Sequence, residues 1–332
     1  MNVWGKNIKI RLYGQSHDKK IGVTIQHFPK NFKIDYDAIT VDMNRRRPGF
    51  NGQIATTRKE NDEFVITSGV TNKITNGKDI KMHILNTNIR PGDYQPIFRP
   101  GHADWTSFIK HQHVATGGGK FSARLTAPVV FAGSLARQYL KEKYNISITA
   151  TISSIGTTKN PTAKQIEKIV EAVKKDNDSV GATIKVVAHN VPSGLGSEFF
   201  GGIEAKVSSL FFAIPGVKGV EWGDGFALAQ TNGSLSNDQI YIDKSKKIYT
   251  KTNHMGGILG GISNGMDIVA NLCFKPTSSI NKPMHSVNYE TMQPAILKTN
   301  GRHDPCIAVR APVIVETYLA LALLELILEE HE

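Results

Sequence analysis

The chain is poor in cysteine, and the two cysteines that it has cannot build a disulfide framework. Cys273 and Cys306 are the only ones among 332 residues. Small secreted domains depend on several such bridges, whereas a chain of this length buries enough surface to fold without them. We therefore expect a reducing environment and a cytoplasmic protein.

Long hydrophobic runs are lacking as well. The first residues, MNVWGKNIKIRLYG, contain no apolar stretch of the length found in signal peptides. The most apolar segment is the C-terminal VIVETYLALALLELILEEHE, in which Glu316, Glu325, Glu329 and Glu330 interrupt the apolar residues. The segment therefore falls short of the ~20 apolar residues of a membrane span. We predict a soluble protein with no membrane contact, whose last segment is a helix that is buried or faces another subunit.

Acidic residues are scarce relative to basic ones. The chain has 40 Lys and Arg against 29 Asp and Glu, a formal net charge of +11. Such a charge indicates an anionic partner, which could be nucleic acid, an anionic membrane surface or small polyanionic ligands. The arginines gather in glycine- and proline-bearing loops such as NRRRPGF and FRPGHADW. This placement favours shaped sites for small anions over a stripe that binds a duplex.

Repeats and low-complexity linkers are absent, so we expect a single domain over residues 1–332. Apolar residues alternate over 63–70, 182–189 and 267–274, which predicts strands. Strands and helices follow one another without a regular βαβ rhythm. The mixture favours an α+β fold over a doubly wound parallel sheet.

Two helices are expected between these strands. The segment NPTAKQIEKIVEAVKK, residues 160–175, carries its apolar residues on one face, with Asn160 as the expected N-cap and Pro161 in the first turn. A second helix should begin near Ser122 and run towards Tyr144. Pro128 should kink this helix or delay its start.

The stretch ATGGGKFSARLTA, residues 115–127, has the composition of an anion-binding loop. Consecutive glycines let backbone N–H groups converge on an anion, and Lys120 and Arg124 would add full charges. The stretch does not match the G-x-x-x-x-G-K-[ST] motif of nucleotide-binding loops, because Val114 and Phe121 occupy required positions. A tight turn capped by Ser122 is the simpler structural alternative, and other anion-binding residues nearby would weigh against it.

Several chemistry-bearing stretches follow one another along the chain. In order they are GQSHD, NRRRPGF, FRPGHADW, GVEWGDGF, NHMGGILGGISNG, FKPTSSI and NGRHDPCIAVRAP. Together and in this order they resemble the chorismate synthase family, from Ile8 to about Leu324. The most specific of them are RPGHAD, GGILGGIS, KPTSS and GRHDPC.

The resemblance implies a fold and a reaction. The fold is an α+β sandwich of antiparallel sheets flanked by helices, assembled as a homotetramer. The reaction is the 1,4-anti elimination of phosphate and a proton from 5-enolpyruvylshikimate 3-phosphate, which yields chorismate in the last step of the shikimate pathway. It requires reduced FMN although it is redox-neutral overall, and NADPH is a candidate reductant.

The resemblance also implies roles for individual residues. The implied catalytic residues are His17 as proton donor to the leaving phosphate, His102 as proton donor to the reduced flavin, and Asp304 as base with Ser16 as its relay. The implied substrate-binding residues are Arg46, Arg99, Arg124 and Arg302. The implied FMN contacts are Lys120, Phe121, Ser122, Pro215, Gly216, Gly260, Lys275, Pro276, Thr277, Ser278, Ser279 and Arg302.

Some positions depart from the family pattern. Asp18 stands where the family has glycine after the histidine, and residues 50–53 lack a further arginine. Within residues 111–125, Lys120 and Phe121 stand where the family has arginine and serine. An alternative is therefore a paralogue that keeps the fold but has a weakened flavin site and altered or lost activity.

Two other classes of function are less favoured. A basic nucleic-acid-binding protein would explain the charge but neither the histidines nor the glycine loops, and the chain lacks a recognised motif for that role. A metal site at His111 and His113 would need a third ligand with sensible spacing, which the sequence does not offer. We expect neither nucleic acid nor a metal ion.

Overall fold

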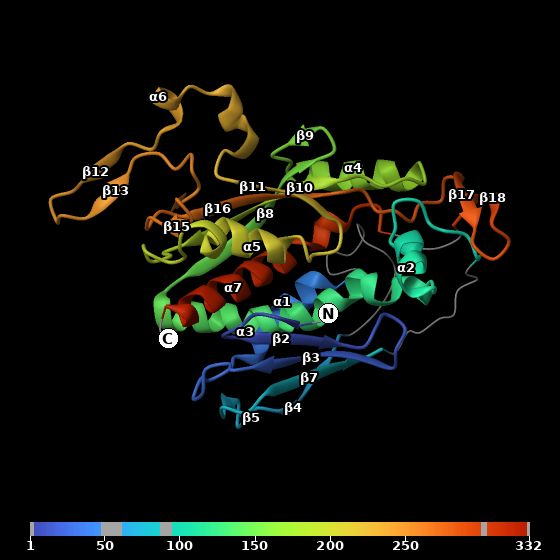
Figure 1. Ribbon diagram of the computed structural model, residues 1–332, viewed down its shortest axis with the longest axis horizontal. Coiled ribbons are helices and arrows are strands. Elements are labelled where there is room, and N and C mark those ends of the chain that lie inside the picture. Colours follow the sequence, from blue (N-terminus) through green and yellow to red (C-terminus); the bar gives the residue numbers. More distant parts are fainter. Residues whose placement is uncertain (1–2, 48–61, 87–94, 300–303, 331–332) are drawn as a thin grey trace.

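The chain folds into two antiparallel sheets with helices between them (Figure 1), and the computed structural model describes residues 3–47, 62–86, 95–299 and 304–330. The first five-stranded sheet has the order β1-β2-β3-β7-β4. Its strands are β1 (Val3–Trp4), β2 (Lys9–Tyr13), β3 (Lys20–Gln26), β7 (Ile80–Leu85) and β4 (Phe64–Ser68). The second has the order β11-β16-β10-β8-β9. Its strands are β11 (Val217–Trp222), β16 (Ile268–Phe274), β10 (Ala182–His189), β8 (Ser147–Ile155) and β9 (Thr158–Lys159).

The strands predicted from alternation are β4, β10 and β16, and all three are present. In β10 the residues Ala182, Ile184, Val186 and Ala188 are buried while those between them are more exposed. This alternation matches the pleat of a strand with one face on the core. β10 pairs with β16 on one side and with β8 on the other.

Helices α1 (Tyr36–Arg46), α3 (Thr126–Tyr144) and α7 (Pro312–Glu329) lie between the two sheets (Figure 1). α7 is apolar on all sides and buried along most of its length, as a helix in this central layer must be. The α+β class and the antiparallel sheets are confirmed. The helices do not only flank the sheets, however, because α7, the most apolar of the described helices, lies in the middle layer.

Two details of the helix predictions change. Pro128 does not kink α3, because it lies in the first turn, where a missing N–H leaves no hydrogen bond unmade. It instead accompanies the delayed start at Thr126. The N-cap of α4 (Ala163–Lys175) is Thr162 and not Asn160, since Thr162 and Gln165 form a reciprocal capping box.

The remaining elements lie outside the two five-stranded sheets and the helices described above. They are β5 (Val70–Thr71), β6 (Ile74–Thr75), α2 (Asp104–His111), η1 (Thr116–Phe121), η2 (Ala123–Leu125), η3 (Phe199–Gly201), α5 (Ile203–Phe211), η4 (Gly225–Gln230), α6 (Gly233–Ser236), β12 (Ile240–Ile242), β13 (Ile248–Thr250), β14 (Ile258–Leu259), β15 (Ile262–Ser263), β17 (Met284–Asn288), β18 (Gln293–Leu297) and η5 (Ile307–Arg310). The β12–β13 hairpin and α6 project from the body of the molecule (Figure 1). Within the described ranges, every helix is too short or too polar to cross a membrane.

Candidate active site

A cleft of about 740 Å³ opens where loops from distant parts of the chain meet. Its walls come from the end of α1, the segment leading into α2, the η1–η2 segment, the α5–β11 connection, the residues after β16 and those before α7. The two sheets and the central helices thus supply a rigid frame, while the lining residues lie in loops and at helix ends. Catalytic and binding residues are often found in such loops.

Most of the residues singled out from the sequence line this cleft. They are Arg46, Arg99, His102, Lys120, Phe121, Ser122, Arg124, Pro215, Gly216, Lys275, Pro276, Thr277, Ser278, Ser279 and Asp304. Ser16 and His17 are not among the lining residues, and Gly260 lies in the turn between β14 and β15. Arg302 lies outside the described residues.

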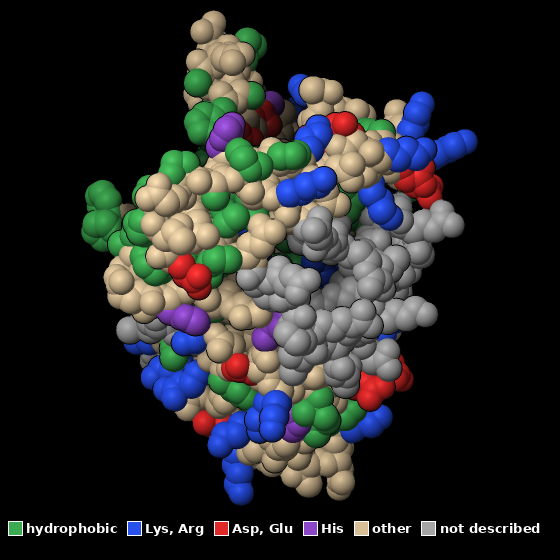
Figure 2. Space-filling view, turned by 90° about the vertical axis from the view of Figure 1, so that its right-hand side faces the viewer, with side chains coloured by type: hydrophobic (Ala, Val, Ile, Leu, Met, Phe, Trp, Pro, Cys, Tyr) green, Lys and Arg blue, Asp and Glu red, His purple; other side chains and the backbone are tan. Residues whose placement is uncertain are grey.

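The cleft is strongly cationic. The described Lys and Arg residues that line it are Arg46, Arg99, Lys120, Arg124, Lys218, Lys275 and Arg310. Asp304 is the acidic residue among the described lining residues, and its carboxylate pairs with Arg310. Figure 2 shows Lys and Arg side chains in separate groups near the upper and lower edges of the side of the molecule that carries α2 and the β17–β18 hairpin. The excess of cations suits a ligand with several negative charges.

Asp62 joins two of the arginines. Its carboxylate accepts hydrogen bonds from Arg46 and from Arg124, and its side chain is 1% exposed. Burial alone would raise the pKa of Asp62, but the two guanidinium groups outweigh burial and hold that pKa below its usual range. Burial also lowers the pKa of Arg46, an effect that the Asp62 carboxylate opposes. One ionised carboxylate therefore fixes two guanidinium groups at the cleft wall.

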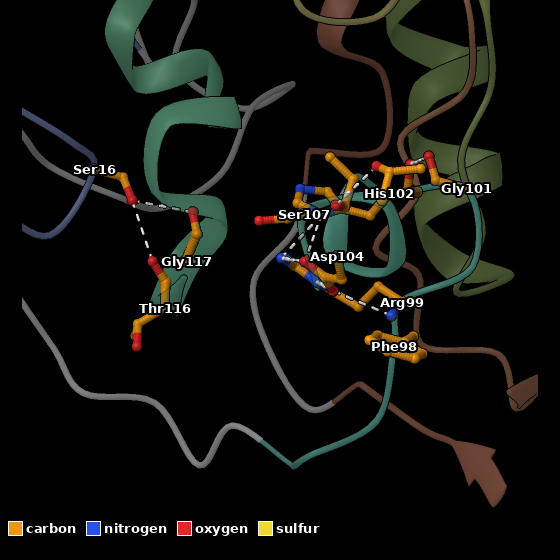
Figure 3. A network of polar contacts seen from close by, with 12 residues as sticks. Ser16, Phe98, Arg99, Gly101, His102, Asp104, Ser107, Thr116 and Gly117 are labelled. Carbon is orange, nitrogen blue, oxygen red and sulfur yellow. Dashed lines mark hydrogen bonds and ion pairs between the residues drawn. The ribbon is translucent and has the colours of Figure 1, made fainter. Parts of the chain in front are cut away.

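A second cluster orients His102 (Figure 3). The Asp104 carboxylate accepts hydrogen bonds from Arg99 Nε and Nη2, each at 2.7 Å, and from His102 Nδ1 at 2.7 Å. Because an ionised carboxylate only accepts, Nδ1 carries the proton and Nε2 is left for chemistry. Burial would raise the pKa of Asp104, but the hydrogen bonds from Arg99 and His102 prevail and hold it well below its usual range.

This depressed pKa predicts how Asp104→Asn changes stability with pH. The unfolded carboxyl binds a proton more readily than the folded one, so the charge stabilises the fold above its ordinary pKa of about 4. The contribution is lost as the pH falls below that value. We expect the wild type to exceed Asp104→Asn in free energy of unfolding by a constant amount from pH 7 to 5, and by less at pH 3. Urea unfolding at these values measures the difference, with the exposed Asp37→Asn as control, and a difference that is the same at pH 3 would contradict the assignment.

The glycine triplet lies between the two histidines. A Cβ atom on Gly117 would come within 1.9 Å of His17 Cε1, and one on Gly118 within 3.2 Å of His102 Cε1 and Nε2. The triplet also has positive φ angles of 61°, 83° and 50°. Ser16 Oγ lies 3.0 Å from His17 Nδ1. It also donates to the carbonyl oxygen of Gly117 at 3.1 Å (Figure 3). The triplet is therefore a thin wall that lets both imidazole rings approach it.

Gly117→Ala is expected to displace His17. The added methyl group has no room beside the ring, and alanine is disfavoured at this φ. We expect turnover to fall by about 10-fold or more, because misplaced catalytic groups lose efficiency steeply. Steady-state kinetics test this, with Gly233→Ala as the control, since its nearest neighbour would lie 3.6 Å from the new methyl group. Unchanged turnover in Gly117→Ala would show that the close approach is not needed.

The segment after β16 forms a polar corner of the cleft. Lys275 Nζ donates to the carbonyl oxygen of Gly101 at 2.9 Å and to Ser278 Oγ. Burial, reinforced by the nearby Lys218, lowers the pKa of Lys275. Thr277 Oγ1 is buried without a hydrogen-bond partner among the described residues. Lys275 and Thr277 are two residues apart in this lining segment, and an ammonium and a hydroxyl group can both donate to an anionic ligand.

Sequence reasoning missed several residues at the site. Asp62, Asn86, Lys218 and Arg310 were not singled out, although Arg310 lies in the NGRHDPCIAVRAP stretch. Two arginines that are expected to bind the same anionic substrate repel each other, and this repulsion could have suggested a carboxylate between them. Nothing in the sequence marks which acid that is.

Comparisons with known proteins agree on one family. The family model described as chorismate synthase matches residues 8–328. The chain is 38% identical over 346 residues to the chorismate synthases of Burkholderia thailandensis and Burkholderia mallei, across 98% of this chain and 92% of each relative. A solved crystal structure of a chorismate synthase superimposes with a TM-score of 0.78 at 24% identity, over 98% of this chain and 93% of the other. This last likeness shows that the fold is shared.

Proposed function

Because the chain belongs to the chorismate synthase family and is a lyase, we propose that its cationic cleft binds 5-enolpyruvylshikimate 3-phosphate and eliminates phosphate and a proton from it. The observation that carries the proposal is a cleft of about 740 Å³ whose described lining residues include seven Lys and Arg residues together with His102. A substrate with a phosphate and two carboxylates needs several fixed cations. Charges attract a ligand more strongly inside a cleft that excludes water than on an open surface, so the shape of the cleft matters as much as its charge.

The arginines bind the anionic groups of the substrate. Arg46 and Arg124 share the Asp62 carboxylate, and both line the cleft. Arg99 is held by Asp104 on one side of its guanidinium. Side chains fixed in this way lose little conformational entropy when the substrate binds. Arg302 joins them by family analogy alone.

The two histidines hold protons on either side of the glycine triplet. His17 would give a proton to the leaving phosphate, and Ser16 Oγ lies within hydrogen-bond distance of its Nδ1. His102, with Nδ1 held by Asp104, presents Nε2 as the atom that exchanges a proton. Asp304 acts as the base, and its carboxylate is held at the cleft wall by an ion pair with Arg310.

The residues of the cleft fit reduced FMN. Thr277 Oγ1 lacks a partner among the described residues, and Lys275 lies in the same segment, so both can hold a phosphate group. Phe121 is 44% exposed and offers an aromatic face to a flat ring. When bound, the reduced flavin supplies electron density that eases departure of the phosphate. Lys120, Ser122, Pro215 and Gly216 complete the proposed contacts, with Gly260 added by family analogy.

The proposal extends to the wider context of the enzyme. We propose that it works in the cytoplasm as a homotetramer, by analogy with the family, and that NADPH is a candidate source of the reducing electrons. The paralogue with a weakened flavin site stays the alternative. Lys120 keeps the charge of the family's arginine but cannot make its bidentate contacts.

Ligand-dependent stability tests this function. A ligand that binds the folded state raises the melting temperature, by a free energy of about 2.7 kcal/mol at 100 times its Kd. We expect FMN with substrate to raise it and a DNA duplex to leave it unchanged. A rise with DNA alone would favour the nucleic-acid-binding alternative.

Thr277→Val tests the phosphate corner. FMN is expected to bind wild type more tightly than riboflavin does, and the variant should lose about 5- to 10-fold of that preference, since it lacks one hydroxyl donor to a charged group. Fluorescence titration with both ligands measures the two dissociation constants. Thr67→Val, at an exposed position of β4, is the control. An undiminished preference for FMN in Thr277→Val would show that the FMN phosphate does not bind at Thr277.

A further inference from the structure

Asn86 connects the arginine wall of the cleft to the loop that carries His17. It is the first residue after β7, and its backbone N–H donates to the carbonyl oxygen of Lys19 at 3.0 Å. This bond continues the pairing of β3 with β7 by one residue. The backbone of Asn86 is therefore fixed by the sheet, and its side chain extends from a rigid base.

The Asn86 amide group uses both of its ends. Its Oδ1 accepts from Arg124 Nε and from Arg124 Nη2, each at 3.2 Å. Its Nδ2 donates to the carbonyl oxygen of Asp18 at 2.6 Å and to that of Ser16 at 3.4 Å. A guanidinium group only donates and a carbonyl oxygen only accepts, so one orientation of the amide satisfies all four contacts. No other uncharged side chain of this size provides an acceptor and a donor in this arrangement.

Asn86 binds the backbone carbonyl groups of Ser16 and Asp18, the residues directly before and after His17 in the chain. The other side of the loop that carries His17 is tied to the glycine triplet, because the Ser16 N–H donates to the carbonyl oxygen of Gly119 at 3.2 Å. Arg124 is held on its other side by Asp62. The chain of contacts Asp62–Arg124–Asn86–loop 16–18 therefore joins a substrate-binding cation to the proton donor.

We propose that Asn86 is a positioning residue that keeps Arg124 and His17 in register, so that the proton donor faces the group that Arg124 anchors. This proposal rests on the function proposed above, in which Arg124 binds the substrate and His17 protonates the leaving phosphate. A residue with a purely structural role would lower stability without separating these two effects.

Two substitutions separate the two ends of the amide. Asn86→Asp keeps an acceptor for Arg124 but places a charged oxygen against the carbonyl groups of Ser16 and Asp18. Asn86→Ala removes both ends. Asn76→Asp is the matched control, because Asn76 lies in an exposed turn where its amide donates to Thr71 Oγ1.

Substrate binding to the flavin-free protein reports on the Arg124 end. Calorimetric titration is expected to give Asn86→Asp a dissociation constant within about 3-fold of wild type, and Asn86→Ala one about 10-fold weaker. An equal loss of affinity in the two variants would overturn the assignment of Oδ1 to Arg124. Asn76→Asp should match wild type.

A double-mutant cycle reports on the His17 end. Asn86→Asp should lower kcat by about 10-fold or more in the wild-type background and by less than about 2-fold when His17 is already alanine. The same fold-loss in both backgrounds would show that Asn86 does not act through His17 and would overturn the proposal. If Asn86→Asp fails to fold, the cycle is run with Asn86→Ala, which carries the same two outcomes.

An NMR titration of the His17 imidazole tests the proposal without an activity measurement. The titration midpoint should differ between wild type and Asn86→Asp and agree between wild type and Asn76→Asp, and identical midpoints in all three would count against the proposal. If wild type binds substrate without converting it, the proposed reaction fails. The calorimetric and NMR comparisons then still decide whether Asn86 couples Arg124 to His17.

Discussion

His102→Ala is expected to slow turnover by about 10²- to 10⁴-fold, the usual contribution of a general acid or base. Asp104 fixes the imidazole by accepting from Nδ1 at 2.7 Å, which leaves Nε2 as the atom that can transfer a proton into the cleft. Gly118 permits this position, because a Cβ there would meet the ring at 3.2 Å. The loss should appear in kcat more than in KM, because the ring takes part in the reaction more than in anchoring the anions.

The matched control is His113→Ala. His113 is exposed and does not line the cleft, so its loss should leave turnover within about 2-fold of wild type. His17→Ala is expected to fall by an order of magnitude or more for the same chemical reason. Wild-type turnover in His102→Ala would show that the His102 imidazole takes no part in the reaction.

Asp62→Ala is expected to cause the largest loss of stability, about 3–5 kcal/mol of unfolding free energy. Arg46 and Arg124 are 1% and 7% exposed, and the variant leaves both guanidinium groups buried without their shared carboxylate. Breaking a buried ion pair is costly because the remaining charge has lost both water and its partner. Urea unfolding measures the loss.

An added anion should repair this variant. Inorganic phosphate or substrate can occupy the space between the two guanidinium groups, so each should raise the melting temperature of Asp62→Ala more than that of wild type. Glu63→Ala, which removes an exposed acid next to Asp62 in the chain, is the control and should behave as wild type. An Asp62→Ala variant as stable as wild type would show that the carboxylate does not hold the arginines.

The fold was largely predictable because local patterns matched the final structure. The alternation of residues 182–189 and the apolar C-terminal segment both correspond to regular elements, β10 and α7. The N-cap of α4 was mispredicted although its T-x-x-Q capping box is visible in the sequence. The placement of α7 between two sheets was not predictable, because an apolar helix packs equally well against a sheet or against another subunit.

The site was predictable where a motif names its residues and not where contacts cross the chain. His102 and Asp104 lie two residues apart in RPGHAD, so their partnership is local. Asp62 and Asn86 accept hydrogen bonds from Arg124, although they are 62 and 38 residues from it in the sequence. Neither residue belongs to a recognisable pattern, and only the folded sheet brings them together. The stretch GGGKFSAR was predicted as an anion-binding loop, and the space that His17 and His102 need explains Gly117 and Gly118.

The single domain, the homotetramer and the roles of all the site residues, Arg302 and Gly260 among them, stay predictions. Arg302 lies outside the described residues, and Gly260 lies away from the cleft. The homotetramer and the roles of Arg302 and Gly260 depend on the family resemblance alone, and they are independent of the geometry around Asp62 and Asp104.

An anaerobic single-turnover assay tests the central claim most directly. The protein is mixed with photoreduced FMN and 5-enolpyruvylshikimate 3-phosphate, and chorismate absorbance and released phosphate are followed together, with oxidised FMN as the control. We expect equal amounts of chorismate and phosphate with reduced FMN and neither product with oxidised FMN. Binding of both ligands without any product at stoichiometric enzyme would contradict the account and favour the paralogue that keeps the fold but has lost the reaction.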